Sequence, residues 1–392
     1  MVTVLKKFLT RKIIIVSLVS FFTDIASEML YPVMPLYLKS IGFSIFIIGV
    51  LEGIAEATAG LSKGYFGVLS DKSGKRVPFI RYGYALSAIS KPLLILMNNP
   101  FWVFLMRSSH RLGKGIRTGA RDALLSDETT KENKGKVFGF HRALDTAGAL
   151  LGPVIAIIYL NYFPESYKNL FILSIIPGMM AIAITFLIRD ASRAGTDYAK
   201  THFMDFIRYL KKSPKSYRIL FIGLITFALF NSSDMFILLR IKTTGISDME
   251  VIWFYVFYNF IYALTSFPIG IIADKLSLKT VLVFGLVIFA VVYAGLAVFN
   301  STLIFYLVLG LYGLYAASTE GIAKALISNV AAPEDTATAI GTFSAFNSVM
   351  LLLSSTLAGL IWVQFGPQAT FLLSACGAFA VAVYLTVALK LK

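Results

Sequence analysis

The chain has 392 residues, of which 57% are hydrophobic and only 15% charged, and its mean hydropathy of +0.76 excludes an ordinary soluble globular protein. A formal net charge of +15 would suit nucleic acid, but the Lys and Arg residues gather in short segments between apolar stretches, so we expect no nucleic-acid partner. The single cysteine, Cys376, excludes a disulfide within the chain. These properties indicate a protein embedded in the lipid bilayer.

Apolar stretches of about 20 residues recur along the whole chain, which is the length a helix needs to cross a bilayer core of about 30 Å. Because backbone polar groups must find partners inside lipid, we expect each stretch to be helical. The first is too long for the core of a signal peptide, so we interpret it as a retained span. The twelve predicted spans are 13–39, 44–69, 77–97, 100–121, 136–160, 169–189, 217–240, 250–273, 279–299, 301–323, 336–362 and 367–390.

Most of the 36 Lys and Arg residues fall on one side of the membrane if the N-terminus is cytoplasmic. By the positive-inside rule we therefore expect a multi-pass protein of the inner or plasma membrane with both termini in the cytoplasm. The longest polar segment separates six spans from six, which predicts two bundles, 1–189 and 217–392, joined by a cytoplasmic linker, 190–216. The linker contains HFMDFIRYL, a short amphipathic pattern that fits a helix lying along the membrane surface.

The two predicted bundles share sequence patterns that lie about 200 residues apart. GVLSDK at 67–72 returns as GIIADK at 270–275, and the segment 123–143 aligns without gaps to 325–345. Two segments with nearly the same offset indicate an internal duplication. In transporters built this way the substrate site lies between the halves, near the middle of the membrane.

Three motifs resemble signatures of the major facilitator superfamily. GVLSDKSGKR (67–76) is similar to its loop signature G-x-L-x-D-R-x-G-R-R, RLGKG (111–115) to the Arg-x-x-x-Gly of its fourth span, and GALLGP (148–153) to the antiporter-associated Gly-x-x-x-Gly-Pro of its fifth. YPVMP (31–35) also fits the drug/proton-antiporter-like branch, and longer stretches are similar to a prokaryotic subgroup. The last signature lacks its usual following Gly-Gly. The resemblance covers all twelve spans and implies an all-α membrane protein, with twelve helices in two pseudo-symmetric six-helix bundles.

The loop and span-five motifs also have a physical interpretation as a conformational gate. Glycines permit close contact between helices, Asp71 can accept hydrogen bonds from a helix N-terminus, and Pro153 bends its helix. The simpler alternatives are a basic loop that only sets topology and glycines that only serve packing. The predicted gate residues are Gly67, Asp71, Lys72, Gly74, Lys75, Arg76, Gly148, Gly152, Pro153 and Asp274.

Charged residues also occur inside the predicted spans, in pairs four residues apart that share a helical face. Exposing one to lipid costs about 2.5–3.5 kcal/mol on insertion scales, so we expect them to face the bundle interior or a wet cavity. The candidates for proton coupling or substrate binding are Asp24, Glu28, Glu52, Glu56, Arg107, Arg111 and Asp234.

Asp24, near the centre of span one, is the leading candidate for the proton carrier. The resemblance implies Arg111 as its partner, and a permanent Asp24–Arg111 ion pair that only fixes packing is the alternative. Arg142 and Asp145 are expected to form a structural pair, and Lys91 to extend towards the outer surface.

The leading interpretation is a secondary active transporter that works by alternating access and exports a small cationic or zwitterionic amphiphile in exchange for protons. A divalent metal-cation exporter and a non-transporting membrane sensor remain alternatives. We expect no enzyme, no catalytic residues, no resident metal and no cofactor, since no nucleophile–His constellation or phosphate-binding loop is present. The expected partners are the small-molecule substrate, protons and the bilayer, and one chain is expected to function as a monomer.

Overall fold

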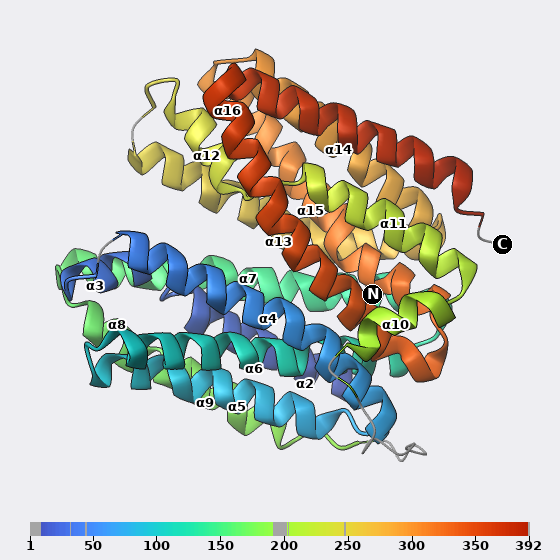
Figure 1. Cartoon of the computed structure of the whole chain (residues 1–392), viewed down its shortest axis with the longest axis horizontal. Helices are drawn as coiled ribbons and strands as arrows, with labels where there is room; N and C mark the ends of the chain where they lie inside the picture. The colour runs from blue at the N-terminus through green and yellow to red at the C-terminus, as the bar shows by residue number, and fades with distance from the viewer. Residues whose placement is uncertain are drawn as a thin grey trace. The chain divides into compact units, whose positions relative to one another are not determined.

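The computed structural model describes residues 9–31, 33–43, 45–190, 202, 204–246 and 248–390, apart from a few side chains that include that of Glu52. These residues form helices and no strands, so the predicted all-α class is confirmed (Figure 1). The longer helices are α2 (Arg11–Glu28), α3 (Met34–Ser40), α4 (Ile45–Ser73), α5 (Val77–Leu93), α6 (Pro100–Asp127), α7 (Lys134–Tyr162), α8 (Tyr167–Leu173), α9 (Ile175–Thr185), α10 (Asp205–Lys212), α11 (Lys215–Phe230), α12 (Met235–Lys242), α13 (Asp248–Lys275), α14 (Leu278–Val298), α15 (Thr302–Val330) and α16 (Thr336–Ala388).

Seven helical segments of the described chain are long and apolar enough to cross a membrane. The last of them covers the two final predicted spans, because α16 is continuous except for a turn at Gly366, whose φ of 85° favours glycine. Helix α6 is not among the seven, although a helix of 28 residues is longer than a bilayer core is thick. Its many charged residues lower its hydropathy, and the candidate functional site begins with them.

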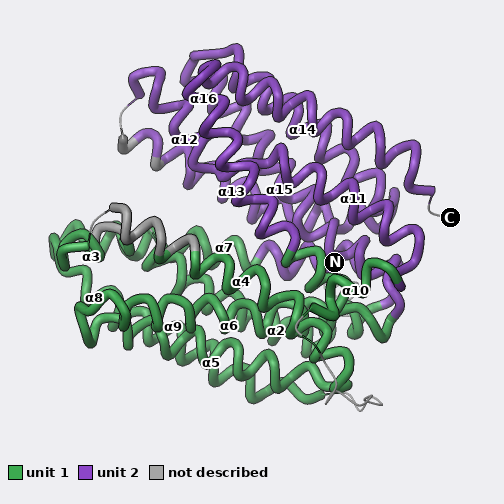
Figure 2. The backbone as a smooth tube through the Cα atoms, viewed as in Figure 1, with its two compact units in different colours: residues 1–129, 144–211, 333–345 green, residues 130–143, 212–332, 346–392 purple. Residues whose placement is uncertain are grey.

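The described chain forms two compact units, coloured green and purple in Figure 2. Within unit 1, α6 packs against α4 and α5, and within unit 2, α15 packs against α13 and α14 in the same pattern. This repetition agrees with the internal duplication inferred from sequence. Unit 1 contains residues 1–129, 144–211 and 333–345, and unit 2 contains residues 130–143, 212–332 and 346–392.

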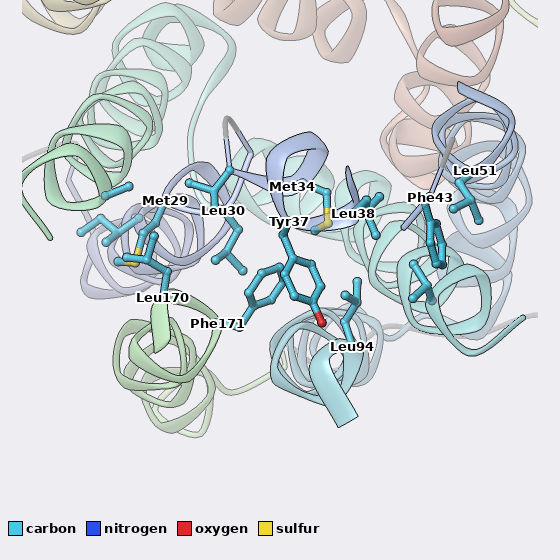
Figure 3. Close-up of a cluster of buried hydrophobic side chains, with 14 residues drawn as sticks. Met29, Leu30, Met34, Tyr37, Leu38, Phe43, Leu51, Leu94, Leu170 and Phe171 are labelled. Carbon is cyan, nitrogen blue, oxygen red and sulfur yellow. The ribbon is translucent and has the colours of Figure 1, made fainter. Parts of the chain in front are cut away.

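One end of unit 1 is closed by a hydrophobic cluster (Figure 3). It joins the end of α2 and the short helix α3 to residues of α4, α6, α7 and α8 and to Leu94, in the 3₁₀ turn that follows α5. At its centre, the rings of Tyr37 and Phe171 lie 5.0 Å apart between centroids, and both side chains are fully buried. Apolar burial of this kind stabilises a helical layer by roughly 1.5–3 kcal/mol for each large side chain. The cluster holds α2, whose charged residues form part of the site, against the other helices of the unit.

The duplicated aspartates have matching roles as caps of helix N-termini. Asp71 accepts hydrogen bonds from the backbone N–H groups of Ala337 (3.3 Å) and Thr338 (2.6 Å), in the first turn of α16 within unit 1. In unit 2, Asp274 accepts from the N–H groups of Gly135 (2.7 Å) and Lys136 (2.8 Å), in the first turn of α7. Each carboxylate therefore satisfies donors that the helix itself leaves unpaired, with favourable interaction with the helix dipole.

The glycine that precedes each of these aspartates allows the close approach. A Cβ at Gly270 would lie 2.9 Å from the backbone carbon of Gly135, and one at Gly67 would lie 2.5 Å from the carbonyl oxygen of Ala337. Arg76 donates to Ser70 (3.0 Å) and pairs with Asp71, and Lys72 pairs with Asp205 of α10 at 3.1 Å. The predicted gate motif is thus a set of contacts around the end of α4.

Replacing Asp274 by alanine removes both acceptors from the start of α7. We expect the loss to cost about 1–2 kcal/mol, as for other N-terminal caps, and to lower the melting temperature of the detergent-purified protein by several degrees. Thermal unfolding of D274A, with E334A as the control, measures this. Glu334 is exposed in a single 3₁₀ turn, so its removal should leave the melting temperature unchanged. An unaltered melting temperature for D274A would contradict the capping role.

Helix α10 in the linker packs on unit 1 rather than lying free along a surface. Phe206 and Tyr209 are buried, and the ring of Phe206 lies against Gly64 of α4. Burial raises the pKa of the Asp205 carboxyl, but the N–H of His202 and the ammonium of Lys72 outweigh it and hold that pKa below its usual range. The predicted amphipathic helix therefore exists, and its apolar face is covered by protein.

Candidate functional site

Two glycines of α7 bring that helix into backbone contact with α2 in unit 1. A Cβ at Gly152 would lie 2.6 Å from the backbone nitrogen of Met29 and 2.9 Å from the carbonyl oxygen of Ile25. A Cβ at Gly148 would meet the carbonyl of Phe21 and lie 3.2 Å from the Cβ of Asp24. These positions can only be glycine at the present helix separation, which explains the predicted Gly-x-x-x-Gly pattern as close packing.

The close contact places Asp145 of α7 beside Asp24 of α2, near enough for their side chains to hydrogen-bond if one of them is protonated. Asp24 remains partly accessible, and Asp145 is buried. Two carboxyl groups so close together disfavour the state in which both are ionised.

Asp145 was not among the residues predicted from the sequence for proton coupling. The sequence predicted that it pairs with Arg142, three residues earlier on the same helix. In the structure Arg142 donates to Glu320 and to the hydroxyl of Tyr262, all within unit 2, and Asp145 lies beside Asp24 in unit 1. The Arg142–Asp145 pair stays a prediction. The sequence signal that could have identified Asp145 is its place one turn before Gly148, on the same face of α7.

A stripe of basic residues runs along α6, where a Lys or Arg recurs every three or four residues. Its members are Arg107, Arg111, Lys114, Arg117 and Arg121. All five lie within α6, which continues to Asp127, past the predicted end of span four at residue 121. Arg107, Arg117 and Arg121 are buried. Residues at this spacing share one helical face, and that periodicity is the signal that sequence reasoning missed.

The acidic residues of α2 and α4 face this stripe. Arg111 forms an ion pair with Glu56 of α4 at 3.1 Å. The pairing of Arg111 with Asp24, which the resemblance implies, stays a prediction. Lys114 lies within electrostatic reach of Asp24, Glu28 and Glu56 and is itself exposed.

A hydrogen-bonded chain links three helices on the other side of the stripe. Arg117 of α6 donates to Ser87 of α5 (2.7 Å) and stacks over the ring of Tyr84, 4.3 Å from its centroid. The hydroxyl of Tyr84 bonds to that of Ser20 on α2 (2.8 Å), and Arg121 also donates to Ser20 (3.2 Å). These contacts hold α2, on which Asp24 lies, against α5 and α6.

Lys91 of α5 differs from its predicted position. The sequence predicted that it extends to the outer surface, but it is buried, at 5% exposure, and its ammonium group makes no hydrogen bond within the described chain. It lies within electrostatic reach of Asp24, Glu28, Arg107 and Arg117. A buried ammonium is costly unless carboxylates compensate its charge, so Lys91 belongs to the same charged cluster.

The cluster in unit 1 is more basic than the sequence analysis assumed. Sequence reasoning set four carboxylates against two guanidinium groups. Among the described side chains, the basic members outnumber the acidic ones. The basic members are Lys91, Arg107, Arg111, Lys114, Arg117 and Arg121, and the acidic members are Asp24, Glu28, Glu56, Asp122 and Asp145.

The remaining predicted residues lie apart from this cluster or outside the described side chains. The side chain of Glu52 is one of those that the structure does not describe. Asp234 is in unit 2, where it accepts hydrogen bonds from two tyrosines. Among the described residues, no three or more His, Cys, Asp and Glu side chains gather as a metal site would require.

Comparison with known proteins gives consistent matches over the whole chain. The family model described as Major Facilitator Superfamily matches residues 16–243 and 220–392. The uncharacterized MFS-type transporter MJ1317 of Methanocaldococcus jannaschii is 31% identical over 370 residues, which cover 93% of this chain and 91% of the relative. The multi-drug resistance efflux pump PmrA of Streptococcus pneumoniae is 27% identical over 140 residues, 35% of each chain.

Among solved structures, the human organic anion transporter MFSD10 (TETRAN) superimposes with a TM-score of 0.77. The match covers 96% of this chain and 99% of that chain at 15% sequence identity. At this identity the similarity concerns the fold.

Proposed function

The chain belongs to the major facilitator superfamily, so it is a multi-pass membrane transporter and not an enzyme, and we propose that it couples export of a small molecule to inward movement of protons. The observation that carries the proposal is the closeness of the Asp24 and Asp145 side chains, which the contact at Gly148 brings together. Two carboxyl groups that share one proton inside a helix bundle can release it when the environment of one of them changes. Alternating access would supply that change.

The basic stripe supports the coupling role of this pair. Lys114 is accessible and within electrostatic reach of Asp24, so its charge favours the ionised form of the pair once the proton leaves. Arg111 is already paired with Glu56 and does not have to move for this exchange. When the proton leaves the pair, the attraction of the nearby Lys114 ammonium for the ionised carboxylate takes its place.

The charge of the cluster in unit 1 narrows the chemical class of the proposed substrate. Of the cationic and zwitterionic amphiphiles expected from the sequence, the zwitterionic class is favoured, because the basic excess of unit 1 attracts an anionic group. The same excess disfavours a divalent metal cation, and Arg111 already neutralises Glu56, one of the carboxylates that such an ion would need.

The contacts of Asp71 and Asp274 support a gating role for the loop motif. Each carboxylate holds the first turn of a helix from the other half of the sequence, and both contacts must break for those helix ends to separate. We propose that these contacts form and break in the transport cycle, with the two six-span halves, 1–189 and 217–392, as the moving parts. We also propose an inner or plasma membrane location, cytoplasmic termini and function as a monomer.

The proposal is tested with the purified full-length chain in proteoliposomes that contain a pH-sensitive dye. Candidate zwitterions, cations and anions are added to one side, and the dye reports proton movement. A substrate that moves protons in the opposite direction supports proton-coupled export of its class. If substrates cross at rates that no pH gradient alters, and no dye response accompanies them, the proposed coupling is wrong.

A further inference from the structure

Asp234 of unit 2, another carboxylate within a candidate membrane span, lies at a break between two helices. The candidate span 215–242 is divided into α11 and α12, and residues 231–234 between them are not helical. Asp234 directly precedes α12, a position at which an aspartate usually bonds to the first turn of the helix. Here the side chain makes no such bond. Its carboxylate instead accepts from the hydroxyls of Tyr258 (2.7 Å) and Tyr312 (2.6 Å).

The break does not depend on Asp234 for its own hydrogen bonds. Ser354 of α16 donates to the carbonyl of Asn231 at 3.1 Å, and the N–H of Ser233 donates to Ser355 at 3.2 Å. Two serines of a neighbouring helix therefore satisfy the opened backbone, as a span requires at membrane depth. The carboxylate of Asp234 is therefore not needed to satisfy the backbone at the break.

The charge of this carboxylate is not balanced by protein. Within the described chain, the hydrogen-bond partners of Asp234 are neutral, and the only charged side chain that influences it is Glu320, of the same sign. Glu56 in unit 1, by contrast, is paired with Arg111 at 3.1 Å. Asp234 is partly accessible, so a ligand can reach it. An unbalanced carboxylate within a membrane span is costly and therefore suited to a cation that comes and goes.

Aromatic rings and a second acceptor surround the carboxylate. The ring of Tyr312 lies 5.3 Å from that of Tyr258 and 5.2 Å from that of Tyr315, measured between centroids. Asn231 donates through Nδ2 to the hydroxyl of Tyr315 (3.1 Å), while its buried Oδ1 accepts no hydrogen bond within the described chain. Aromatic faces attract ammonium groups, and the amide oxygen can accept an N–H donor.

We propose that Asp234, with Asn231 and the tyrosines Tyr258, Tyr312 and Tyr315, binds the protonated amine of the transported molecule. The carboxylate supplies the charge, Asn231 accepts one N–H, and the rings enclose the alkyl part next to the ammonium. This inference rests on the proposed export function, because it assigns the cationic end of the substrate. Binding at equilibrium needs no pH gradient, so it can be tested separately from coupling.

The test uses the detergent-purified full chain and two fluorescent probes. Monodansylcadaverine ends in a primary ammonium group, and N-hexyl dansylamide carries a neutral methyl group in its place. We expect the wild-type protein to bind the cationic probe at least about tenfold more tightly, equivalent to about 1.4 kcal/mol. In D234N the two probes should bind alike, whereas D234E, which keeps the charge, should retain the preference.

The matched control is Y306F, which removes a tyrosine hydroxyl from the same helix as Tyr312 but outside the site, against Phe254 and Phe257. It should retain the wild-type preference. Equal affinity of the two probes for the wild-type protein, no binding of either, or an unchanged preference in D234N would each overturn the assignment. If D234N does not yield a monodisperse protein, D234E decides: it should retain the preference for the cationic probe with an altered affinity, while Y306F keeps both the preference and the affinity of the wild type. An affinity of D234E equal to that of the wild type would then overturn the assignment. Equal binding of the two probes by D234N, with proton release from the Asp24–Asp145 pair retained, would separate this site from the coupling mechanism.

Discussion

In proteoliposomes, the D24N variant is expected to lose pH-gradient-driven substrate movement, down to the leak of protein-free liposomes, while it still binds substrate. The amide that replaces the Asp24 carboxyl would remain able to bond to Asp145 but could not release a proton, so the coupled step would stop with the fold intact. Transport driven by a pH gradient and substrate binding in detergent are measured on the same preparation. D145N should behave in the same way, because the proton belongs to the pair rather than to either residue.

The double variant provides the sharper comparison. If Asp24 and Asp145 form one proton site, D24N/D145N should be no more impaired than either single variant, since residues that act as a unit are strongly non-additive. E334Q, at an exposed carboxylate outside the cluster, is the control and should transport at the wild-type rate. Full pH-dependent coupling in either single variant would refute the assignment of the proton to this pair.

The G152A variant is expected to be both less stable and less active than the wild type. Its new Cβ would meet the backbone of α2 at Met29 and Ile25, where no side chain can rotate away. Overpacking of this kind costs about 1–3 kcal/mol, and it would move α7 away from α2 and so separate Asp145 from Asp24. We expect a lower melting temperature together with weaker proton coupling, measured by thermal unfolding and by the dye assay.

G310A in α15 is the matched control for this substitution. A Cβ there would lie 3.7 Å from the ring of Phe257, which is ordinary contact, and alanine favours a helix by about 1 kcal/mol over glycine. G310A should therefore be as stable as the wild type or slightly more stable. A G152A protein with the melting temperature and coupling of the wild type would show that close α2–α7 contact is not required.

The fold could be predicted from sequence because its signals are repeated along the chain. Apolar stretches of bilayer length recur, and the two Gly–Asp motifs ending at Asp71 and Asp274 share nearly the same offset as the aligned segments. In the structure each aspartate caps a helix N-terminus, the role that the sequence suggested for Asp71. Helix existence and the role of glycine follow from local spacing, which one sequence contains in full.

The pairing of charged side chains could not be predicted in the same way. The sequence suggested Asp24 as the partner of Arg111, but it did not identify the ion pair of Arg111 with Glu56 or the closeness of Asp24 to Asp145. Which acid meets which base depends on the rotation and separation of helices that are distant in sequence. Helix α6 also continues to Asp127, past the predicted end of span four at residue 121. An amphipathic charged helix within a membrane bundle resembles a loop when only hydropathy is considered.

The hydrogen bond between Asp24 and Asp145 is the central claim, and infrared spectroscopy of the carboxylic C=O stretch tests it most directly. The wild-type protein at neutral pH should show a band of a protonated carboxylic acid that shifts or disappears in D24N and in D145N but not in E334Q. A wild-type spectrum at neutral pH without such a band, or with a band that both aspartate variants leave unchanged, would contradict the claim that these two residues hold the proton.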